Sequence, residues 1–261
     1  MSAGTSSIVT AGATNPPTSW PAHSHDSHEL VWVRRGAMIT RAHDRIFAVP
    51  EGRGIWLPAG TEHSGEVTSG VTLYGTLFAP DRTPGDFTAP AQVTVVVMTP
   101  VLELLLTYLG QDTLSDAARG RAEAVVFDVL HPTDTPLDLP VPDDPRIAPV
   151  VRALLENPGD HSGLDVWARR LGTSERTVTR AFRESTGLPF GRWRMTLRIQ
   201  RALTLLGDGT PVQDVAVQPG YAQTSTFIDT FRRTMGTTPG THLPASTSGA
   251  SGMSENQDRM S

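Results

Sequence analysis

The apolar positions between residues 164 and 186 repeat with the period of an α-helix. One helix face is made of Leu164, Trp167, Ala168 and Leu171, at i, i+3, i+4 and i+7. Ser162 and Asp165 have the form of a capping box before this face, Gly172 suits a left-handed stop after it, and Ser174 can cap a second helix. In that second helix Val178 and Phe182 point inward, and the outward positions are Arg176, Thr177, Thr179, Arg180 and Arg183. Two short helices joined by a turn with glycine predict a helix-turn-helix, whose second helix can lie in a DNA major groove.

The same arrangement occurs again between residues 210 and 235. Thr210-Pro211-Val212-Gln213 offers a cap, a proline at the first helical position and a reciprocal glutamine. The turn is predicted at Gln218–Tyr221 and the second outer helix at Gln223–Thr234. The buried positions of this helix are Phe227, Phe231 and Met235, and its outward positions are Gln223, Thr224, Thr226 and Arg232. One long helix, Phe190–Leu206, is predicted to connect the two units, with a buried stripe of Met195, Ile199, Ala202, Leu203 and Leu206.

The first half of the chain has the pattern of short β-strands. Apolar runs separated by glycine and proline predict a small barrel or sandwich; they cover residues 30–33, 37–40, 45–49, 54–57, 71–78 and 93–97. Two helices are predicted to follow, at residues 100–109 and 115–130. Their apolar faces are Leu102, Leu105, Leu106 and Leu109, and Ala118, Ala122, Val125, Val126 and Val129. These faces can pack on their own barrel or form the seam of a homodimer.

These patterns predict an α+β chain of two domains, which suits its 261 residues. A β-barrel domain with helices is expected at residues 19–131, and an all-α domain with two helix-turn-helix units at residues 144–243. Residues 132–143 contain four prolines among acidic residues, which is typical of a stiff linker with few contacts across it. A helix at Ile147–Leu155, starting near Asp144-Pro145 or one turn later because of Pro149, is expected to brace the first unit. Residues 1–18 and 244–261 are rich in small polar residues and are predicted to be disordered.

The net charge of −5 is distributed unevenly along the chain. Residues 162–243 contain eleven arginines and six acidic residues, so positive charge gathers where a DNA backbone would lie. Cysteine is absent, which excludes a disulfide framework, a thiolate metal site and a cysteine nucleophile. The sequence has no apolar run long enough for a bilayer, and residues 1–17 lack the pattern of a secretory signal. We therefore expect a cytoplasmic protein without membrane contact.

Several segments of the helical half carry a more specific pattern. They are Leu171–Val178, Phe182–Gly187, Gly220-Tyr221, Phe227, Phe231–Arg233 and Gly236–Gly240. Together they resemble the AraC family of bacterial transcription regulators. The resemblance implies binding to double-stranded DNA, with the two units in successive major-groove segments on one side of the duplex. The sequence departs from the family pattern at Pro219, which is expected to shorten the preceding helix, and at Asp229, an acid on the outer face.

The resemblance also assigns roles to the outward residues. Arg176, Thr179 and Arg180 align with base-reading positions of the first unit, next to Thr177 on the same face. The base-reading positions of the second unit are Gln223, Thr224, Ser225 and Thr226. Arg183, Arg194, Arg232 and Arg233 are interpreted as phosphate contacts, which position a protein on DNA without specifying sequence. On a lone helix these residues would form only a solvated face, but two such helices in a basic domain favour DNA contact.

A second pattern lies in the β-rich half. His23-Ser24-His25 is followed by Glu29 and Gly36, and Gly52 is followed by Pro58, Gly60 and His63. This resembles the two cupin motifs, although Pro17 and Val67 replace an expected glycine and an expected asparagine. On one strand, the shared parity of His23, His25 and Glu29 would turn all three into the barrel, where His63 would complete a four-ligand site. Such a site suits Zn, Ni, Fe or Mn.

Two alternatives remain open for these histidines. They can bind a divalent metal ion, or they can line a pocket for an organic effector. His28 has the opposite parity and is predicted to be exposed. His43 and His131 have no visible partners in the sequence and receive no role.

Two classes of function follow from these patterns. The first is a transcription regulator that responds to a small molecule or a metal ion. The second is a metal-dependent cupin enzyme, a dioxygenase or isomerase, fused to a DNA-binding domain. An enzyme needs a general base or substrate clamp beside the cluster, and Arg34, Arg35 and Glu51 are candidates by proximity alone. Since nothing in the sequence favours them, we predict a regulator that is not an enzyme and binds double-stranded DNA as a homodimer.

Overall fold

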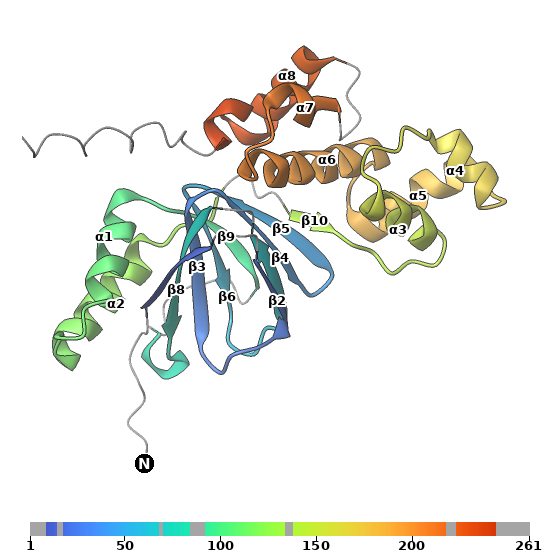
Figure 1. Cartoon of the computed structure of the whole chain (residues 1–261). Helices are drawn as coiled ribbons and strands as arrows, with labels where there is room; N and C mark the ends of the chain where they lie inside the picture. The colour runs from blue at the N-terminus through green and yellow to red at the C-terminus, as the bar shows by residue number, and fades with distance from the viewer. Residues whose placement is uncertain are drawn as a thin grey trace, which may run out of the picture.

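The computed structural model describes residues 9–14, 18–67, 70–83, 92–133, 138–217 and 223–243, and of residues 9–14 only the backbone. A β-barrel carries a pair of helices on one side, and a group of C-terminal helices lies above it (Figure 1). The predicted architecture, a barrel with helices followed by an all-α region, is confirmed. In the described part of the chain, no helix is both long enough and apolar enough to cross a bilayer.

The barrel consists of two antiparallel five-stranded sheets. The first sheet has the order β1 (Val9–Thr14), β8 (Val71–Phe78), β3 (His28–Arg35), β6 (Arg53–Leu57) and β9 (Thr94–Val97). The second sheet has the order β10 (Asp138–Pro140), β5 (Arg45–Pro50), β4 (Ala37–Ala42), β7 (His63–Val67) and β2 (Thr18–His23). Two short 3-10 helices, η1 (Pro80–Arg82) and η2 (Pro239–His242), lie outside the sheets.

Alternation along the strands decides which side chains fill the barrel. In β3, Val31 and Val33 belong to the inner core, whereas Leu30 and Trp32 belong to a second core on the outer face of the same sheet. The buried residues of the inner core are Val33, Met38, Ala42, Phe47, Val49, Ile55, Leu57, Val67, Val71 and Val95. Apolar side chains from both sheets therefore occupy the barrel interior.

Two helices cover the outer face of the first sheet. They are α1 (Pro100–Leu109) and α2 (Asp116–Val129), each capped by the hydroxyl of the preceding Thr99 or Ser115. Leu102 and Val126 are fully buried in the core that also holds Trp32. Apart from Val125, which is exposed, the predicted apolar faces thus pack on their own barrel.

The C-terminal helices contain both predicted units. They are α3 (Ala148–Glu156), α4 (Leu164–Arg170), α5 (Glu175–Thr186), α6 (Phe190–Gly207), α7 (Val212–Val217) and α8 (Thr224–Met235). In the first unit, Gly172 has a φ of 64° in the turn, and the Ser174 hydroxyl accepts a hydrogen bond from the backbone N–H of Thr177 at 3.2 Å. Gly187, with a φ of 71°, ends α5. The predicted turn Gln218–Tyr221 and the predicted disorder of residues 244–261 lie outside the described residues.

Two local predictions are wrong. Residues 1–18 are not disordered throughout, because β1 pairs along its whole length with β8. The first residue before α4 is Gly163 rather than Ser162, whose backbone N–H donates instead to Asp160. The helix predicted at Ile147–Leu155 is confirmed, because α3 begins at Ala148, one turn after Asp144-Pro145, as the position of Pro149 allows.

The segment predicted to be a linker is part of the barrel. Within residues 132–143, β10 pairs with β5, and Leu139 is fully buried. The indole N–H of Trp193 in α6 donates to the carbonyl of Pro140 at 2.7 Å. The expectation of few contacts across this segment is wrong, because a strand needs a partner for its backbone and Leu139 removes apolar surface from water. The domain boundaries themselves stay predictions.

Candidate metal centre and nucleic-acid interface

Three strand ends bring four predicted ligands together. His23 is the last residue of β2, Glu29 is the second residue of β3, and His63 is the first residue of β7, with His25 in the turn between β2 and β3. The premise that His23, His25 and Glu29 share one strand is wrong, because the chain turns after His23. Pairing of His23 with His63 across β2 and β7 gathers the side chains instead.

The three histidines form a compact group. One ring nitrogen from each of His23, His25 and His63 lies within 4.8 Å of the other two, so the group could hold a metal ion. Glu29 Oε2 lies 3.3 Å from His63 Nε2 and 3.5 Å from His25 Nε2. The Nδ1–H of His63 donates to the carbonyl of Thr61 at 3.0 Å, which fixes the ring and leaves Nε2 facing Glu29.

The electrostatics of the cluster suit a cation. Burial lowers the pKa of His63, the neighbouring Glu29 and the carbonyl of Thr61 raise it, and the net pKa lies above the ordinary value. Glu29 Oε2 is buried and has no hydrogen bond of good geometry. A buried carboxylate oxygen is costly without a charged or hydrogen-bonding partner, and a metal ion or a protonated His63 supplies one.

Two glycines of the second cupin-like segment form turns, Gly60 beside this cluster and Gly52 at the other end of β3. Gly60 has a φ of 77°, and its backbone N–H donates to the carbonyl of His25 at 2.8 Å. Gly52, with a φ of 75°, forms the turn before β6 and donates its N–H to the carbonyl of Val33. Positive φ angles favour glycine, so the two glycines of the motif are explained by the backbone conformation of these turns.

His28 is not exposed as predicted. Its ring stacks on Trp56 with centroids 5.1 Å apart, and its Nδ1 accepts a hydrogen bond from the backbone N–H of Ala59 at 3.0 Å. Burial lowers the pKa of His28 below its ordinary value. His28 therefore supports the loop beside the cluster as a neutral ring.

The enzyme candidates lie away from the cluster. Glu29 is near the start of β3 and Arg35 is its last residue, so about six residues, roughly 20 Å of extended strand, separate them. Arg34, Arg35 and Glu51 line a different cleft, together with Gly207 and His242. None of these three can serve as a general base or substrate clamp for the histidines.

The first candidate element for nucleic-acid binding is the outer face of α5. Arg176, Arg180 and Arg183 are exposed there, while Thr177 and Thr179 are half-buried. The Thr177 hydroxyl lies 3.0 Å from the Ser174 hydroxyl at the start of the helix. Arg180 Nε lies 3.7 Å from Glu184 Oε1. Because this ion pair is exposed to solvent, it contributes little to stability and leaves the guanidinium available for another partner.

The second element is α8. Gln223 at its N-terminal end and Ser225, Thr226, Arg232 and Arg233 are exposed, and Thr224 is half-buried. Phe227 and Phe231 are fully buried on the opposite face. Asp229 lies 3.9 Å from Arg232 on the exposed face, so the unusual acid has a cation beside it.

Arg194 does not fit its predicted role. It is half-buried, its Nη1 donates to the carbonyl of Ser162 at 2.8 Å, and its guanidinium lies over the Phe190 ring at 4.9 Å. Burial also lowers the pKa of Arg194. These contacts join α6 to the loop before α4, which argues against a phosphate contact.

Sequence reasoning missed the residues that join the two halves of the chain. Trp193 and Gln200 of α6 are buried and donate hydrogen bonds to backbone carbonyls of β10 and β5. The signal in the sequence is Gln200 itself, a polar residue directly after Ile199 of the predicted apolar stripe, because a polar side chain that becomes buried needs a hydrogen-bond partner.

Comparison with known proteins gives the family. Residues 6–163 match the AraC-like ligand binding domain, and residues 167–243 match a helix-turn-helix domain. The chain is 32% identical over 227 residues to the HTH-type transcriptional regulator NimR of Escherichia coli K12, which covers 85% of this chain and 82% of NimR. It is 28% identical over 220 residues to the HTH-type transcriptional regulator RipA of Corynebacterium glutamicum, across 82% of this chain and 61% of RipA.

A crystal structure of ToxT from Vibrio cholerae is also similar, with a TM-score of 0.38 and 14% identity, and covers 92% of this chain and 97% of that one. The curated relatives are transcriptional regulators, not enzymes. The chain belongs to the AraC family of DNA-binding transcriptional regulators and carries an AraC-like ligand-binding domain before its helix-turn-helix region.

Proposed function

We propose that this regulator senses a divalent metal ion, held by His23, His25, Glu29 and His63. The observation that carries the proposal is the convergence of three histidines with a buried carboxylate oxygen that has no good hydrogen bond. Imidazole and carboxylate ligands suit Zn, Ni, Fe or Mn, and the residues present fit such an ion. When bound, the ion would neutralise Glu29 and tie the ends of β2, β3 and β7 to one another.

An organic effector in the barrel is the alternative to a metal ion. Such a molecule needs a concave, largely apolar pocket. The inner faces of both sheets are instead packed with buried apolar side chains, and the polar cluster lies at strand ends. This packing favours a small ion over an organic molecule.

We further propose that the two outer helices read DNA. Arg176, Thr179 and Arg180 of α5 are assigned to base edges, as are the four residues Gln223, Thr224, Ser225 and Thr226 of the second unit. Arg183, Arg232 and Arg233 are assigned to phosphates, and Thr177 acts mainly at the start of α5. Support comes from the exposed position of the arginines and from the buried opposite faces of both helices.

The proposed homodimer uses the outer surface of α1 and α2. Apolar side chains remain exposed there although the inner faces of both helices are buried. They are Leu104 at 71%, Val101 at 49%, Val125 at 41% and Tyr108 at 39%. Covering them with a second copy would remove apolar surface from water.

The direct test combines metal analysis with DNA mapping. Protein purified both with and without air is analysed for bound metal, and its genomic binding sites are mapped with and without that metal. Stoichiometric metal that changes the occupancy of a defined set of sites supports the proposal. Protein that never holds stoichiometric metal in either preparation contradicts it and leaves an organic effector.

A further inference from the structure

One hydrophobic core crosses from the barrel into the DNA-binding helices. Its barrel members are Ala37, Ile39, Ile46, Ala48 and Leu139, each exposed by 7% or less. They lie on the outer face of the second sheet, opposite the inner core. Its helical members include Trp193, Ile199 and Leu203 of α6. Helix α6 therefore covers this face of the barrel, as Figure 1 shows.

Two buried hydrogen bonds fix α6 on the sheet. Gln200, 3% exposed, donates through Nε2 to the carbonyl of Ile46 in β5 at 3.1 Å. Trp193, fully buried, donates through Nε1 to the carbonyl of Pro140 in β10 at 2.7 Å. Apolar packing alone is not directional, whereas breaking a buried hydrogen bond leaves a desolvated partner without compensation. These bonds therefore select one position of α6 on the sheet.

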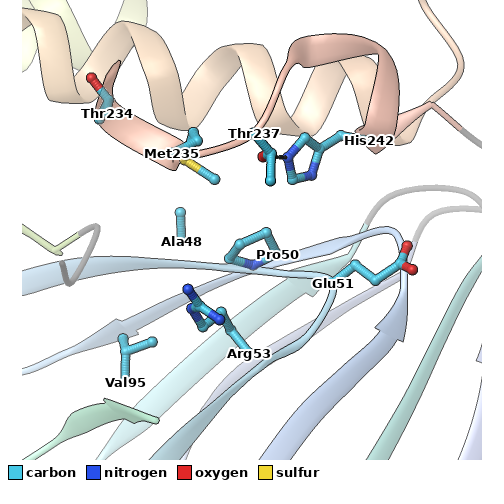
Figure 2. A pocket seen from close by; sticks show the side chains of 9 residues that line it. All are labelled: Ala48, Pro50, Glu51, Arg53, Val95, Thr234, Met235, Thr237 and His242. Carbon is cyan, nitrogen blue, oxygen red and sulfur yellow. Dashed lines mark hydrogen bonds between the residues drawn. The ribbon is translucent and has the colours of Figure 1, made fainter. Parts of the chain in front are cut away.

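The second helix-turn-helix unit meets the barrel more loosely. Figure 2 shows Met235, Thr237 and His242 facing Pro50 and Arg53 across a gap. This gap is a cavity of about 100 Å³. The contact through α6 also borders an open cleft, of about 500 Å³ and lined in part by Ile39, Ile46 and Gln200. What distinguishes that contact is the shared apolar core and the two buried hydrogen bonds within it.

The candidate metal centre and the surface beneath α6 share a sheet. His63 begins β7, which pairs with β4 through His63 and Ala42. Strand β4 places Ala37 and Ile39 on the outer face under α6. One strand pairing therefore separates a metal ligand from the surface that holds the DNA-binding helices.

We propose that the outer face of the second sheet is a docking platform for α6, which makes the barrel and the DNA-binding helices one cooperative folding unit. Gln200 and Trp193 are the positioning residues of this platform. Because α6 also joins the two helix-turn-helix units, a displacement of β7 and β4 reaches both units through it. This last step rests on the proposed metal sensing, whereas the single folding unit does not.

The folding part is tested on metal-free, full-length protein by calorimetry and hydrogen exchange. Gln200→Leu roughly keeps the side-chain volume and removes the amide that donates to Ile46. Trp193→Phe keeps an aromatic ring and removes the N–H that donates to Pro140. The control is Arg201→Gln, which changes an exposed neighbour of Gln200. Wild type and Arg201→Gln should unfold in one transition, with β3 and α6 protected together. In the other two variants α6 should lose protection before β3. Separate transitions in the wild type, or unchanged relative protection in both variants, would overturn the platform.

The coupling part uses Zn²⁺ as the probe and DNA affinity as the readout. Zn²⁺ should change the DNA affinity of wild type and Arg201→Gln by about fivefold or more, a usual size for coupling between two sites. Gln200→Leu should still bind Zn²⁺ but lose most of this change. An equal effect of Zn²⁺ on all three proteins would overturn the route through α6. Failure of Zn²⁺ to bind any of them would count against metal sensing, and the folding test would then decide the platform alone.

Discussion

Glu29→Gln should separate the carboxylate from the rest of the candidate metal centre. The substitution keeps the side-chain volume at a site where Glu29 Oε2 lies 3.3 Å from His63 Nε2. If the carboxylate is a ligand, its loss should weaken metal binding by about 100-fold, at the upper end of the range for supporting residues. At a free metal concentration of 100 times the wild-type dissociation constant, the stabilisation by metal would fall from about 2.7 to about 0.4 kcal/mol. For a chain of this size, that difference lowers the melting temperature by roughly 5–9 °C.

The assay is thermal unfolding of wild type, Glu29→Gln and Glu62→Gln at fixed free metal. Glu62 is an exposed carboxylate next to His63, so Glu62→Gln controls for loss of local charge. Without metal, the raised pKa of His63 means that its pairing with Glu29 stabilises the fold below the unfolded pKa of about 6.5. That contribution disappears as pH rises through the folded pKa, and Glu29→Gln should abolish it. Equal metal affinity in Glu29→Gln and wild type would refute the carboxylate as a ligand.

Three further predictions concern DNA, assembly and acid. Arg180→Ala should lose about 1–3 kcal/mol at particular base pairs, whereas Arg232→Ala should weaken all sequences alike, and binding-site selection at several salt concentrations checks both. Leu104→Glu should shift sedimentation toward the monomer without changing the circular dichroism, because Leu104 is 71% exposed. Hydrogen bonds from Arg146 and Ser185 hold the pKa of Asp144 well below its ordinary value. The hydrogen bonds of the Asp144 carboxylate therefore stabilise the fold at pH values above the unfolded pKa of Asp144, and this stabilisation is lost only in strong acid. In an acid titration that follows helicity, Asp144→Asn should unfold at a higher pH than wild type.

The helical half could be predicted closely from the sequence because its signals are local. Ser174 caps α5 and Gly172 takes a left-handed conformation after α4, as a hydroxyl and a glycine at helix ends predict. Helix periodicity also identified Phe182 and Phe231 as buried. Each of these signals lies within about one turn of the element that it defines.

The histidine cluster was predicted for a partly wrong reason. Parity on one strand was expected to align His23, His25 and Glu29, but a turn separates β2 from β3. The spacing still brought the residues together, since β2 pairs with β7 and places His23 beside His63. Strand pairing is a long-range property, so periodicity within one segment could not reveal it.

Residues 132–143 were mispredicted as a linker because the prediction used their proline and acidic content alone and did not consider that one of them could be buried. Proline and acidic residues favour an extended segment, and β10 is indeed extended. An extended segment can also be an edge strand, where proline is tolerated because one side of the strand needs no hydrogen-bond donor. Leu139, between Asp138 and Pro140, was the residue that distinguished a paired strand from a free linker, because it is fully buried.

The outer face of the second sheet, on which α6 packs, can be recognised from an apolar run in the sequence of β5. A strand with one face in the core and one in water alternates apolar and polar residues, whereas a strand covered on both faces is apolar throughout. Ile46-Phe47-Ala48-Val49 has no polar residue, and all four side chains are buried. Phe47 and Val49 face the barrel core, and Ile46 and Ala48 face the core shared with α6. An uninterrupted apolar run in an antiparallel strand therefore predicts a second layer, and in this chain the DNA-binding helices supply that layer.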